Sequence, residues 1–404
     1  MSPNPGSIVS TNTEGLGEFQ HVVFLGIFNA ERFLGKIGDW LPNLQFGDSA
    51  LVIADNASTD KSSEMVSELA KHKGIPYAVI RNARNYGGYG NLAANLEYFH
   101  SAEWVTTLHQ DDHYKANHLA GHREILKKPP ENLGMVASEA KSLDVRGKSI
   151  PYPRANWLLA ADADPVTIFL ANLKQHVFPF SGATFAKQAL LDFPIPWHST
   201  AFPDTELVMK MVTDYRFVFA PGITVEYLEN PQSESHSLSD INRDQGAFHA
   251  LIRVFSHPNY AKICKAVRPE SQDNFLDALI EGIQVRIHDP YLREILVQTT
   301  LELSAQYIGM SPKIAHRLVQ VHLAARDYRA VEVLTNIASG NGQKLSFEHE
   351  EAAQSHSKNK GKSWLLSLLR SAPRGLRVFL MRSLMASSAG KRILRSWNFD
   401  WNDQ

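Results

Sequence analysis

The sequence has almost no cysteine, no long apolar run and no excess of either charge. Its one cysteine, Cys264, among 404 residues excludes an intrachain disulfide and a cysteine-based zinc cage. No run approaches the roughly 18 apolar residues of a membrane span, and no basic residue precedes Arg32, so a signal peptide is not expected. A net charge of −1 argues against a whole-surface nucleic-acid binder. We therefore expect a soluble protein of a reducing compartment, placed in the cytoplasm and with no nucleic-acid partner.

Apolar runs of strand length alternate with stretches of helix length in the first third of the chain. Hydrophobic residues make up 44% of the sequence, enough for a packed core. Runs that are apolar on both faces are typical of parallel strands covered by helices on each side. The alternation predicts an α/β fold, a doubly wound and mostly parallel sheet with helices on both faces. The predicted strands are 21–28, 49–54, 77–80 and 104–108, and the predicted helices between them are 31–44, 61–73 and 91–100.

The pattern changes along the rest of the chain. Shorter apolar runs at 135–137, 183–185 and 216–219 complete the same domain, and from about residue 241 apolar residues follow the helical period, so an α-helical C-terminal region is expected. A length of 404 residues also exceeds what one core usually serves. The predicted segments are a flexible N-terminal tail (1–18), the α/β domain (19–240), a helical region (241–340), a polar linker (341–362) and a basic amphipathic tail (363–404).

The near-neutral total charge hides an asymmetry. Residues 358–404 carry ten basic and two acidic side chains, a net charge of +8, so the other residues must carry −9 to give the total of −1. Basic amphipathic segments that contain tryptophan bind membrane interfaces or partner proteins. Residues 363–395 could therefore hold the protein as a peripheral membrane protein on a cytoplasmic membrane face, or could pack on the main body.

Two carboxylates follow the second predicted strand. Ligands bind outside the carboxyl ends of strands in open α/β sheets, and Asp55 stands at that position. Asp60 directly precedes Lys61 and the next helix, where an aspartate commonly caps the free N–H groups. We therefore expect Asp55 to contact a ligand and Asp60 to cap the helix.

The fourth predicted strand ends in His109-Gln110-Asp111-Asp112. Adjacent carboxylates repel each other unless a cation or hydrogen-bond donors lie between them. Carboxylate oxygens at one edge of a sheet suit Mg²⁺ or Mn²⁺, which accept phosphate oxygens as further ligands. This motif predicts a divalent cation site.

Seven short motifs in a fixed order resemble the family 2 glycosyltransferases of the GT-A fold. The resemblance covers about residues 20–240. It is carried by the order and spacing of the motifs at 26–29 (GIFN), 55–60 (DNASTD), 84–91 (RNYGGYGN), 109–112 (HQDD), 180–183 (FSGA), 203–207 (PDTEL) and 230–236 (NPQSESH).

The resemblance implies transfer of a sugar, with inversion at the anomeric carbon, from a nucleotide-diphosphate donor to an acceptor hydroxyl. A UDP-sugar is the expected donor and a glycan or glycolipid the expected acceptor, as in polysaccharide biosynthesis. Phe28 and Asn29 would border the base, Asp55 would hold the base or ribose, and Asp112 would coordinate the metal. Since the family usually has Asp-x-Asp and this chain has His109 at the first position, either Asp111 or Asp112 could be the main ligand.

Basic and glycine residues after the third predicted strand could bind the diphosphate. Arg81 and Arg84 would neutralise phosphate charge there, or they are ordinary surface charges. Gly88 opens the next helix, whose first N–H groups could bind phosphate, unless the glycines only allow close packing. His236 could add a metal or phosphate contact or lie on the surface, and Trp197 and His198 are candidates for the acceptor site.

Inversion by a single displacement requires a base opposite the leaving group. By resemblance this base is Asp204, although Pro203-Asp204 also reads as a helix start in which the aspartate caps the N–H groups. Glu206 is the substitute candidate.

Two other functions compete with the metal-assisted hexosyltransferase. A catalytically idle GT-A domain could serve as a binding or scaffold module, against which the set of Asp55, Asp112 and Asp204 argues. A sugar-nucleotidyltransferase would carry a Gly-rich, Arg-containing loop after the first strand, where this chain has residues 26–30 (GIFNA).

Overall fold

The protein was analysed as a computed structural model that describes residues 6–12, 16–99, 101–144, 148–150, 163–175, 177–194, 202–228 and 239–324. The chain divides into two compact units, Met1–Ala338 and Ser339–Gln404, and every described residue lies in the first. The predicted linker 341–362 and basic tail 363–404 lie outside the described residues, as do Trp197, His198 and His236.

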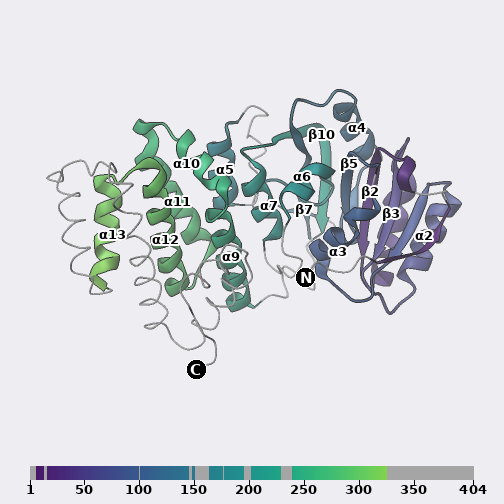
Figure 1. The fold of residues 1–404 in the computed structure, drawn as a ribbon. Helices are drawn as coiled ribbons and strands as arrows, with labels where there is room; N and C mark the ends of the chain where they lie inside the picture. The colour runs from purple at the N-terminus through teal and green to yellow at the C-terminus, as the bar shows by residue number, and fades with distance from the viewer. Residues whose placement is uncertain are drawn as a thin grey trace, which may run out of the picture. The chain divides into compact units, whose positions relative to one another are not determined.

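One mixed sheet forms the centre of the first unit (Figure 1), with the described strands in the order β1-β4-β3-β2-β5-β9-β7-β10-β6 and β8 paired with β7. Strands β4, β3, β2 and β5 are parallel to one another, as are β7 and β10, and the remaining pairs are antiparallel. The predicted α/β sheet with long parallel ladders is confirmed. The strands are β1 (Ser7–Thr11), β2 (His21–Ile27), β3 (Ala50–Asp55), β4 (Tyr77–Arg81), β5 (Trp104–His109), β6 (His113–Tyr114), β7 (Leu133–Leu143), β8 (Ser149–Ile150), β9 (Thr184–Ala186) and β10 (Arg216–Leu228).

The helices begin at positions that the sequence marks clearly. Proline occupies the first helical position of α5, α7, α10, α12 and α13, where its missing N–H costs nothing. The predicted helical region after residue 241 is present as α9 to α13. The helices are α1 (Leu34–Trp40), α2 (Ser62–His72), α3 (Gly87–Asn95), α4 (His118–Leu126), α5 (Pro165–Lys174), α6 (Lys187–Asp192), α7 (Pro203–Met211), α9 (Asp240–Phe255), α10 (Pro258–Ala266), α11 (Gln272–Arg286), α12 (Pro290–Ile308) and α13 (Pro312–Ala324).

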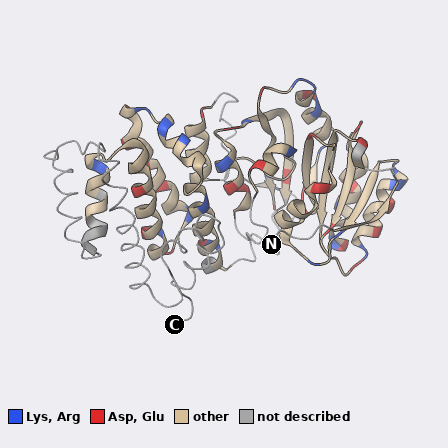
Figure 2. Cartoon of the chain, viewed as in Figure 1, with Lys and Arg blue, Asp and Glu red and all other residues tan. Residues whose placement is uncertain are grey.

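Single 3₁₀ turns flank several of these helices, at Leu16–Glu18, Glu31–Phe33, Leu41–Asn43, Leu96–Tyr98 and Pro269–Ser271. None of the helices in the described part of the chain is long and apolar enough to cross a bilayer. Lys and Arg residues are interspersed with Asp and Glu residues over both the sheet and the helices (Figure 2).

The register of the central strands brings their carboxyl ends together. Val22 to Leu25 of β2 and Leu51 to Ala54 of β3 are almost completely buried, as expected for strands covered on both faces. Across the ladders, Ile27 pairs with Asp55, Asp55 pairs with Arg81, and Gly26 pairs with His109. The last residues of β2, β3, β4 and β5 therefore lie at one edge of the sheet.

The prediction of a loose tail over residues 1–18 is wrong for Ser7–Thr11, which forms the edge strand β1 antiparallel to β4. All five residues are exposed, so burial does not explain the strand. Polar contacts anchor its ends instead: Gly6 N donates to Asn95 Oδ1 at 3.2 Å, and Asn12 exchanges hydrogen bonds with the backbone of Ile75 and Tyr77. Such contacts leave no trace in a hydropathy pattern.

A chain of polar side chains crosses the core of the sheet. His21 is hydrogen-bonded to Ser49 at 2.9 Å and Thr106 at 2.7 Å, and Thr106 is hydrogen-bonded to Thr184 at 2.5 Å. His122 continues the chain from Thr184, at 2.7 Å, to Ser138, at 2.8 Å. The ring of His118 packs 4.7 Å from that of His122. All three histidines are buried. His21 and His122 have both ring nitrogens hydrogen-bonded, whereas His118 has one hydrogen bond among the described residues, from Nε2 to the Gly182 carbonyl at 2.8 Å.

Candidate functional site

Asp55, at the end of β3, is fully buried and only half satisfied. Its Oδ1 accepts the N–H of Ser58 at 2.7 Å, whereas its Oδ2 has no hydrogen-bond partner among the described residues. Arg81 Nε lies 3.6 Å from Oδ2, and Arg81 Nη2 donates to the Ser58 carbonyl at 2.6 Å. An orphaned buried carboxylate oxygen is costly. This atom is therefore an acceptor suited to a ligand N–H or O–H group.

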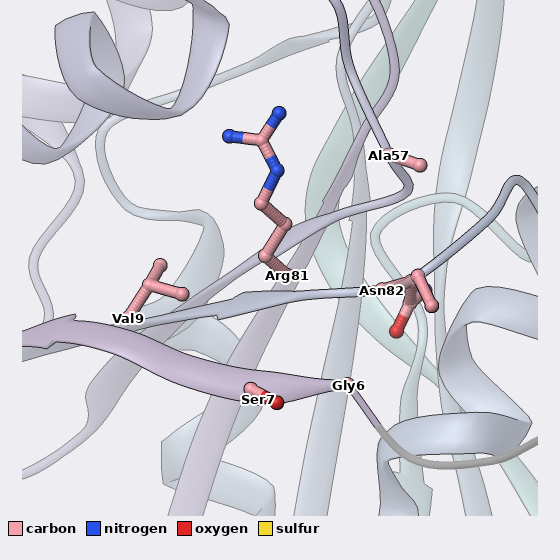
Figure 3. A pocket seen from close by; sticks show the side chains of 7 residues that line it. Gly6, Ser7, Val9, Ala57, Arg81 and Asn82 are labelled. Atoms are coloured by element: carbon pink, nitrogen blue, oxygen red, sulfur yellow. The ribbon is translucent and has the colours of Figure 1, made fainter.

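A cavity of about 460 Å³ opens beside Arg81. Figure 3 shows that Gly6, Ser7 and Val9 of the β1 segment line one side, and that Ala57, Arg81 and Asn82 line the other. The sequence analysis did not foresee the contribution of the N-terminal strand. Because Ala57 and Arg81 also flank Asp55, the cavity adjoins the end of β3.

The end of β2 is tied to the loops on both sides. Phe28 is 39% exposed, and its N–H and carbonyl both bond the side chain of Gln110, at 2.8 and 3.2 Å. Asn29 has a positive φ of 46°, and its Oδ1 accepts the N–H of Thr59 at 2.9 Å. These contacts link the loops that follow β2, β3 and β5. The Phe28 ring is partly exposed and does not belong to the buried core.

Asp60 contacts the start of α2, the helix that the sequence predicted it to cap. Its Oδ1 accepts the N–H of Ser62 at 3.0 Å and its Oδ2 accepts the N–H of Glu31 at 3.1 Å, although Lys61 occupies the N-cap position itself. Burial alone would raise the pKa of Asp60, but these hydrogen bonds outweigh it and hold the pKa below the ordinary value.

The loop after β5 brings His109, Asp111 and Asp112 together. One ligand atom from each lies within 4.8 Å of the others, with Asp112 Oδ2 3.7 Å from His109 Nδ1. Asp112 is buried, Asp111 is half-buried and the His109 side chain is 46% exposed. A ring nitrogen and two carboxylates from one loop suit Mn²⁺ or Mg²⁺ and leave further coordination positions for a ligand. The side chains present therefore fit a divalent cation.

The protonation of His109 agrees with that fit. Partial desolvation of the ring lowers the pKa of His109, and this effect outweighs Asp111 and Asp204, whose negative charges raise it. A neutral imidazole has a lone pair available for a metal ion. The histidine that replaces the family's first aspartate can therefore still serve as a ligand.

Two residues that the sequence analysis missed support this loop. The hydroxyl of Tyr114 accepts the N–H of His109 at 2.7 Å and is hydrogen-bonded to Ser181 at 2.6 Å. The Tyr114 ring is buried edge-on against Trp40, with centroids 4.9 Å apart. The motif at 180–183 thus contributes to the site through a serine that orients Tyr114.

An asparagine cluster lies under the start of α3. Asn56 and Asn82, the first residues after β3 and β4, are linked at 3.0 Å, and Asn91 joins Asn82 at 2.8 Å and the Ala54 carbonyl at 2.8 Å. Asn85 Oδ1 accepts the N–H of Gly87 at 2.7 Å, so the Gly87 N–H already has a partner within the loop. The signal in the sequence was an asparagine at each strand end.

The two other candidates for phosphate binding sit at the surface of this cluster. Gly88 is exposed in the first turn of α3, and its neighbour Gly87 has a φ of 75°, which favours glycine. Arg84 is exposed and stacks over the ring of Tyr86 at 5.0 Å. Both positions are open to a ligand.

Asp204 stands at the second position of α7, half-buried. The N-cap residue is Phe202, in a left-handed conformation with φ of 57° and no side-chain cap, so Asp204 is not the N-cap residue of this helix. Its Oδ1 accepts the N–H of the adjacent Thr205 at 2.7 Å. The Asp204 charge raises the pKa of Tyr89 and opposes the lowering at His109, so Asp204 lies near both α3 and the β5 loop.

Glu206 cannot serve as the substitute base. It is fully buried, and Arg253 of α9 donates to both of its oxygens, at 2.6 to 3.0 Å. Lys210 also donates to Oε1 at 2.5 Å. Both Glu206 oxygens are occupied by these hydrogen bonds and are out of reach of solvent, so the expectation of a catalytic Glu206 is wrong.

Aromatic rings line the space between these groups. The rings of Tyr89 and Phe180 are 5.3 Å apart, and Phe180 lies 6.2 Å from the His109 ring. Burial raises the pKa of Tyr89, with Glu206 and Asp204 adding to the effect, so its hydroxyl stays protonated. Asp55 and the His109–Asp112 loop therefore lie at one edge of the sheet, and the charge of Asp204 acts on His109 of that loop.

Residues 23–190 match the model of the family described as "Glycosyl transferase family 2". No curated protein is similar enough in sequence to count as a relative. The match covers the strand ends from Phe28 to Ser181, and the base candidate Asp204 lies outside it.

Solved structures show more distant similarity. TarS 1–349 of S. aureus in complex with UDP-GlcNAc is 14% identical, with a TM-score of 0.47 over 81% of this chain and 94% of that chain. The mannosyltransferase PcManGT of Pyrobaculum calidifontis, in complex with GDP-Man and Mn²⁺, is 15% identical, with a TM-score of 0.45 over 85% and 92%. At these TM-scores the similarities add nothing to the assignment, which depends on the family match and on the site.

Proposed function

We propose, from the match of residues 23–190 to the model of glycosyl transferase family 2, that this protein transfers a hexose, with inversion, from a nucleoside diphosphate-sugar to an acceptor hydroxyl. UDP-sugars are the proposed donors, and a glycan or glycolipid the proposed acceptor. The observation that supports the proposal is that Asp55 and the His109–Asp112 cluster follow parallel strands at one sheet edge, with the charge of Asp204 acting on His109.

The donor's base and ribose would bind at the end of β3. Asp55 Oδ2, which has no hydrogen-bond partner among the described residues, would accept a hydrogen bond from the base or ribose, and the exposed ring of Phe28 would cover the base. The cavity beside Arg81 offers room next to this carboxylate. Asn29 would act through the loop it holds, since its side chain already bonds Thr59.

The diphosphate would extend towards the β5 loop. His109, Asp111 and Asp112 would hold Mn²⁺ or Mg²⁺, and such an ion, when bound, supplies a Lewis acid that stabilises charge on a departing phosphate. Arg84 and the Gly88 end of α3 are placed on the exposed side of the same edge. Tyr114 keeps the loop in place because its hydroxyl accepts the His109 N–H.

Asp204 would act as the base. The acceptor oxygen bonds the anomeric carbon, the bond from that carbon to the phosphate oxygen breaks, and the hydroxyl proton passes to the Asp204 carboxylate. The Asp204 charge acts on Tyr89, whose ring packs 5.3 Å from that of Phe180, and we propose that the acceptor lies by these rings. Trp197, His198 and His236 are retained as proposed contacts to the acceptor and the metal or phosphate.

The test combines donor binding with turnover. Calorimetry of UDP-sugars and GDP-sugars with Mn²⁺ is expected to find a donor, and product detection with a glycan panel measures transfer. Asp204→Asn should lower kcat by about 10²- to 10⁴-fold and change donor affinity less than about threefold. Asp277→Asn, on a surface ion pair of α11, is the matched control and should keep both.

Two results would contradict the proposal. Near-normal turnover of Asp204→Asn would remove this residue from the chemistry. Donor binding without transfer or hydrolysis, for every sugar tested, would favour the idle scaffold module instead. A nucleotidyltransferase would reveal itself by forming a nucleotide sugar from a sugar phosphate and a nucleoside triphosphate.

We further propose a peripheral association with a cytoplasmic membrane face through residues 363–395. The support is the net charge of +8 over residues 358–404, since each basic residue near an anionic surface is worth about 1 kcal/mol. Sedimentation with anionic vesicles would test it, and a chain without residues 358–404 that sediments equally would contradict it.

A further inference from the structure

We propose that the helical region after residue 239 is a working part of the active site, because Arg253 and Arg286 hold the start of α7 and thereby position Asp204. This inference builds on the proposed function, in which Asp204 is the base. Both arginines lie outside residues 23–190, the part of the chain that matches the family, and neither is a catalytic residue in the sense of touching the substrate.

The first connection runs from α9 to Glu206. The Arg253 guanidinium donates through Nε to both Glu206 oxygens, at 2.9 and 3.0 Å, and through Nη2 to Oε2 at 2.6 Å. Lys210, one helical turn after Glu206, donates a further hydrogen bond to Glu206 Oε1 at 2.5 Å. Glu206 is 0% exposed. Because a rigid guanidinium fork fixes both the distance and the orientation of a carboxylate, it fixes the turn of α7 that carries Asp204 two residues earlier.

The second connection runs from α11 to the residues around Phe202. Arg286 donates to the carbonyls of Leu173 and Asn172, both at 2.8 Å, and its guanidinium lies 5.2 Å from the Phe202 ring centroid. Asn172 in turn donates to the Thr205 carbonyl at 3.2 Å. One arginine thus fixes the end of α5 and the residue that precedes α7.

The held segment has a backbone that would not keep its shape unaided. Phe202 has a φ of 57°, in the left-handed region that side chains other than glycine rarely adopt. Such a conformation is unfavourable for a residue with a side chain and persists only where surrounding contacts enforce it. Arg286 contacts Phe202, two residues before Asp204. The ion pairs of Glu206 hold the helix two residues after Asp204. These contacts therefore hold the backbone on both sides of Asp204.

The electrostatic surroundings of the segment are balanced. Glu206 and Lys210 lie on α7, and Arg253 reaches Glu206 from α9. The other titratable groups near the segment are Tyr89 of α3 and His109 of the β5 loop. The Glu206 charge is compensated by its two cations. A change that keeps a positive charge at 253 but removes the fork consequently tests geometry rather than charge.

The experiment uses the full chain with Arg253→Lys, Arg286→Lys and the control Lys313→Met, which removes an exposed ion pair to Asp277 on the far helices. Turnover, KM for the acceptor, donor affinity by calorimetry, thermal unfolding and hydrogen exchange of the peptide covering 202–211 are measured for each. Both Lys variants should lose about tenfold or more in kcat, since small misplacement of a reacting group is costly. Donor affinity should change less than twofold, and exchange over 202–211 should accelerate while the unfolding midpoint falls by only a few degrees.

The outcomes separate the inference from the proposed function. Unchanged exchange over 202–211 in both Lys variants would overturn the inference even if the enzyme is active, as would equal losses in donor affinity and kcat. If the wild-type chain transfers no sugar, the proposed function fails, and faster exchange over 202–211 in the variants would still establish that α9 and α11 hold this segment. A variant that fails to fold is replaced by the other, because the two arginines contact different elements.

Discussion

The three buried histidines beneath the site predict a specific loss of stability in mild acid. Burial lowers the pKa of His21 to about 3 and that of His118 to about 4. Burial lowers the pKa of His122 well below its ordinary value, and His118 and His21 add to this. His118 Nδ1 is buried without a hydrogen-bond partner in the described part of the chain, so a second ring proton would find no acceptor there.

The sign and size follow from proton linkage. In the unfolded chain each histidine titrates near pH 6.5, whereas in the folded protein all three stay neutral until far lower pH. The unfolded state therefore binds more protons as the pH falls, so the stabilisation is complete above about pH 6.5 and is lost below it. Between pH 7 and pH 5 the loss is about 2 kcal/mol for each histidine, or about 6 kcal/mol in all, a large share of a typical folding free energy of about 5–15 kcal/mol.

Urea unfolding followed by circular dichroism at pH 7, 6 and 5 measures this loss. His122→Gln removes one titrating group but keeps an amide that can bond Thr184 and Ser138, the two hydroxyl partners of the ring. Its free energy of unfolding should fall by about 2 kcal/mol less than that of the wild type over this range. The matched control, His72→Gln, changes an exposed residue in the last turn of α2 and should follow the wild-type curve.

Two results would refute the reasoning. A free energy of unfolding that stays constant from pH 7 to pH 5 would mean that the buried rings accept protons in the folded state. A His122→Gln variant with the same pH dependence as the wild type would mean that other groups cause the loss.

Two further predictions concern the metal loop and a glycine beside it. Asp112→Ala should abolish the rise in melting temperature that Mn²⁺ and a nucleotide sugar give together, and should leave any metal-independent shift unchanged; an equal effect in the presence of a chelator would argue against a metal role. Gly182→Ala should destabilise the fold by about 2–3 kcal/mol, because its φ is 76° and a Cβ would lie 2.6 Å from Val225 and 2.8 Å from His118. Chemical denaturation checks this, and a wild-type midpoint would contradict it.

The strands of the sheet and the groups at their ends could be predicted from the sequence for a local reason. A strand buried on both faces must be apolar throughout, so β2, β3, β4 and β5 stand out as runs, and their last residues are then known. Parallel pairing places those ends at one edge, which is why Asp55 and the 109–112 motif could be assigned to one site before any geometry was known.

The N-terminal strand and the support of the metal loop could not be predicted in this way. Strand β1 is exposed along its whole length and is held by main-chain pairing and polar contacts from residues 63 to 92 positions away. Tyr114 and Ser181 are 67 positions apart, and neither position carries a pattern that announces a hydrogen bond to the other.

The roles of Asp204 and Glu206 show where the sequence ends and the tertiary structure decides. The sequence alone determined that two carboxylates lie at the start of a proline-led helix, and it left cap, base and substitute base open. Only the fold brings Arg253, 47 positions along the chain, onto Glu206, and only the backbone places Phe202 in the cap position. Local patterns specify elements because burial acts on neighbouring residues, whereas the state of a carboxylate depends on which distant charges pack against it.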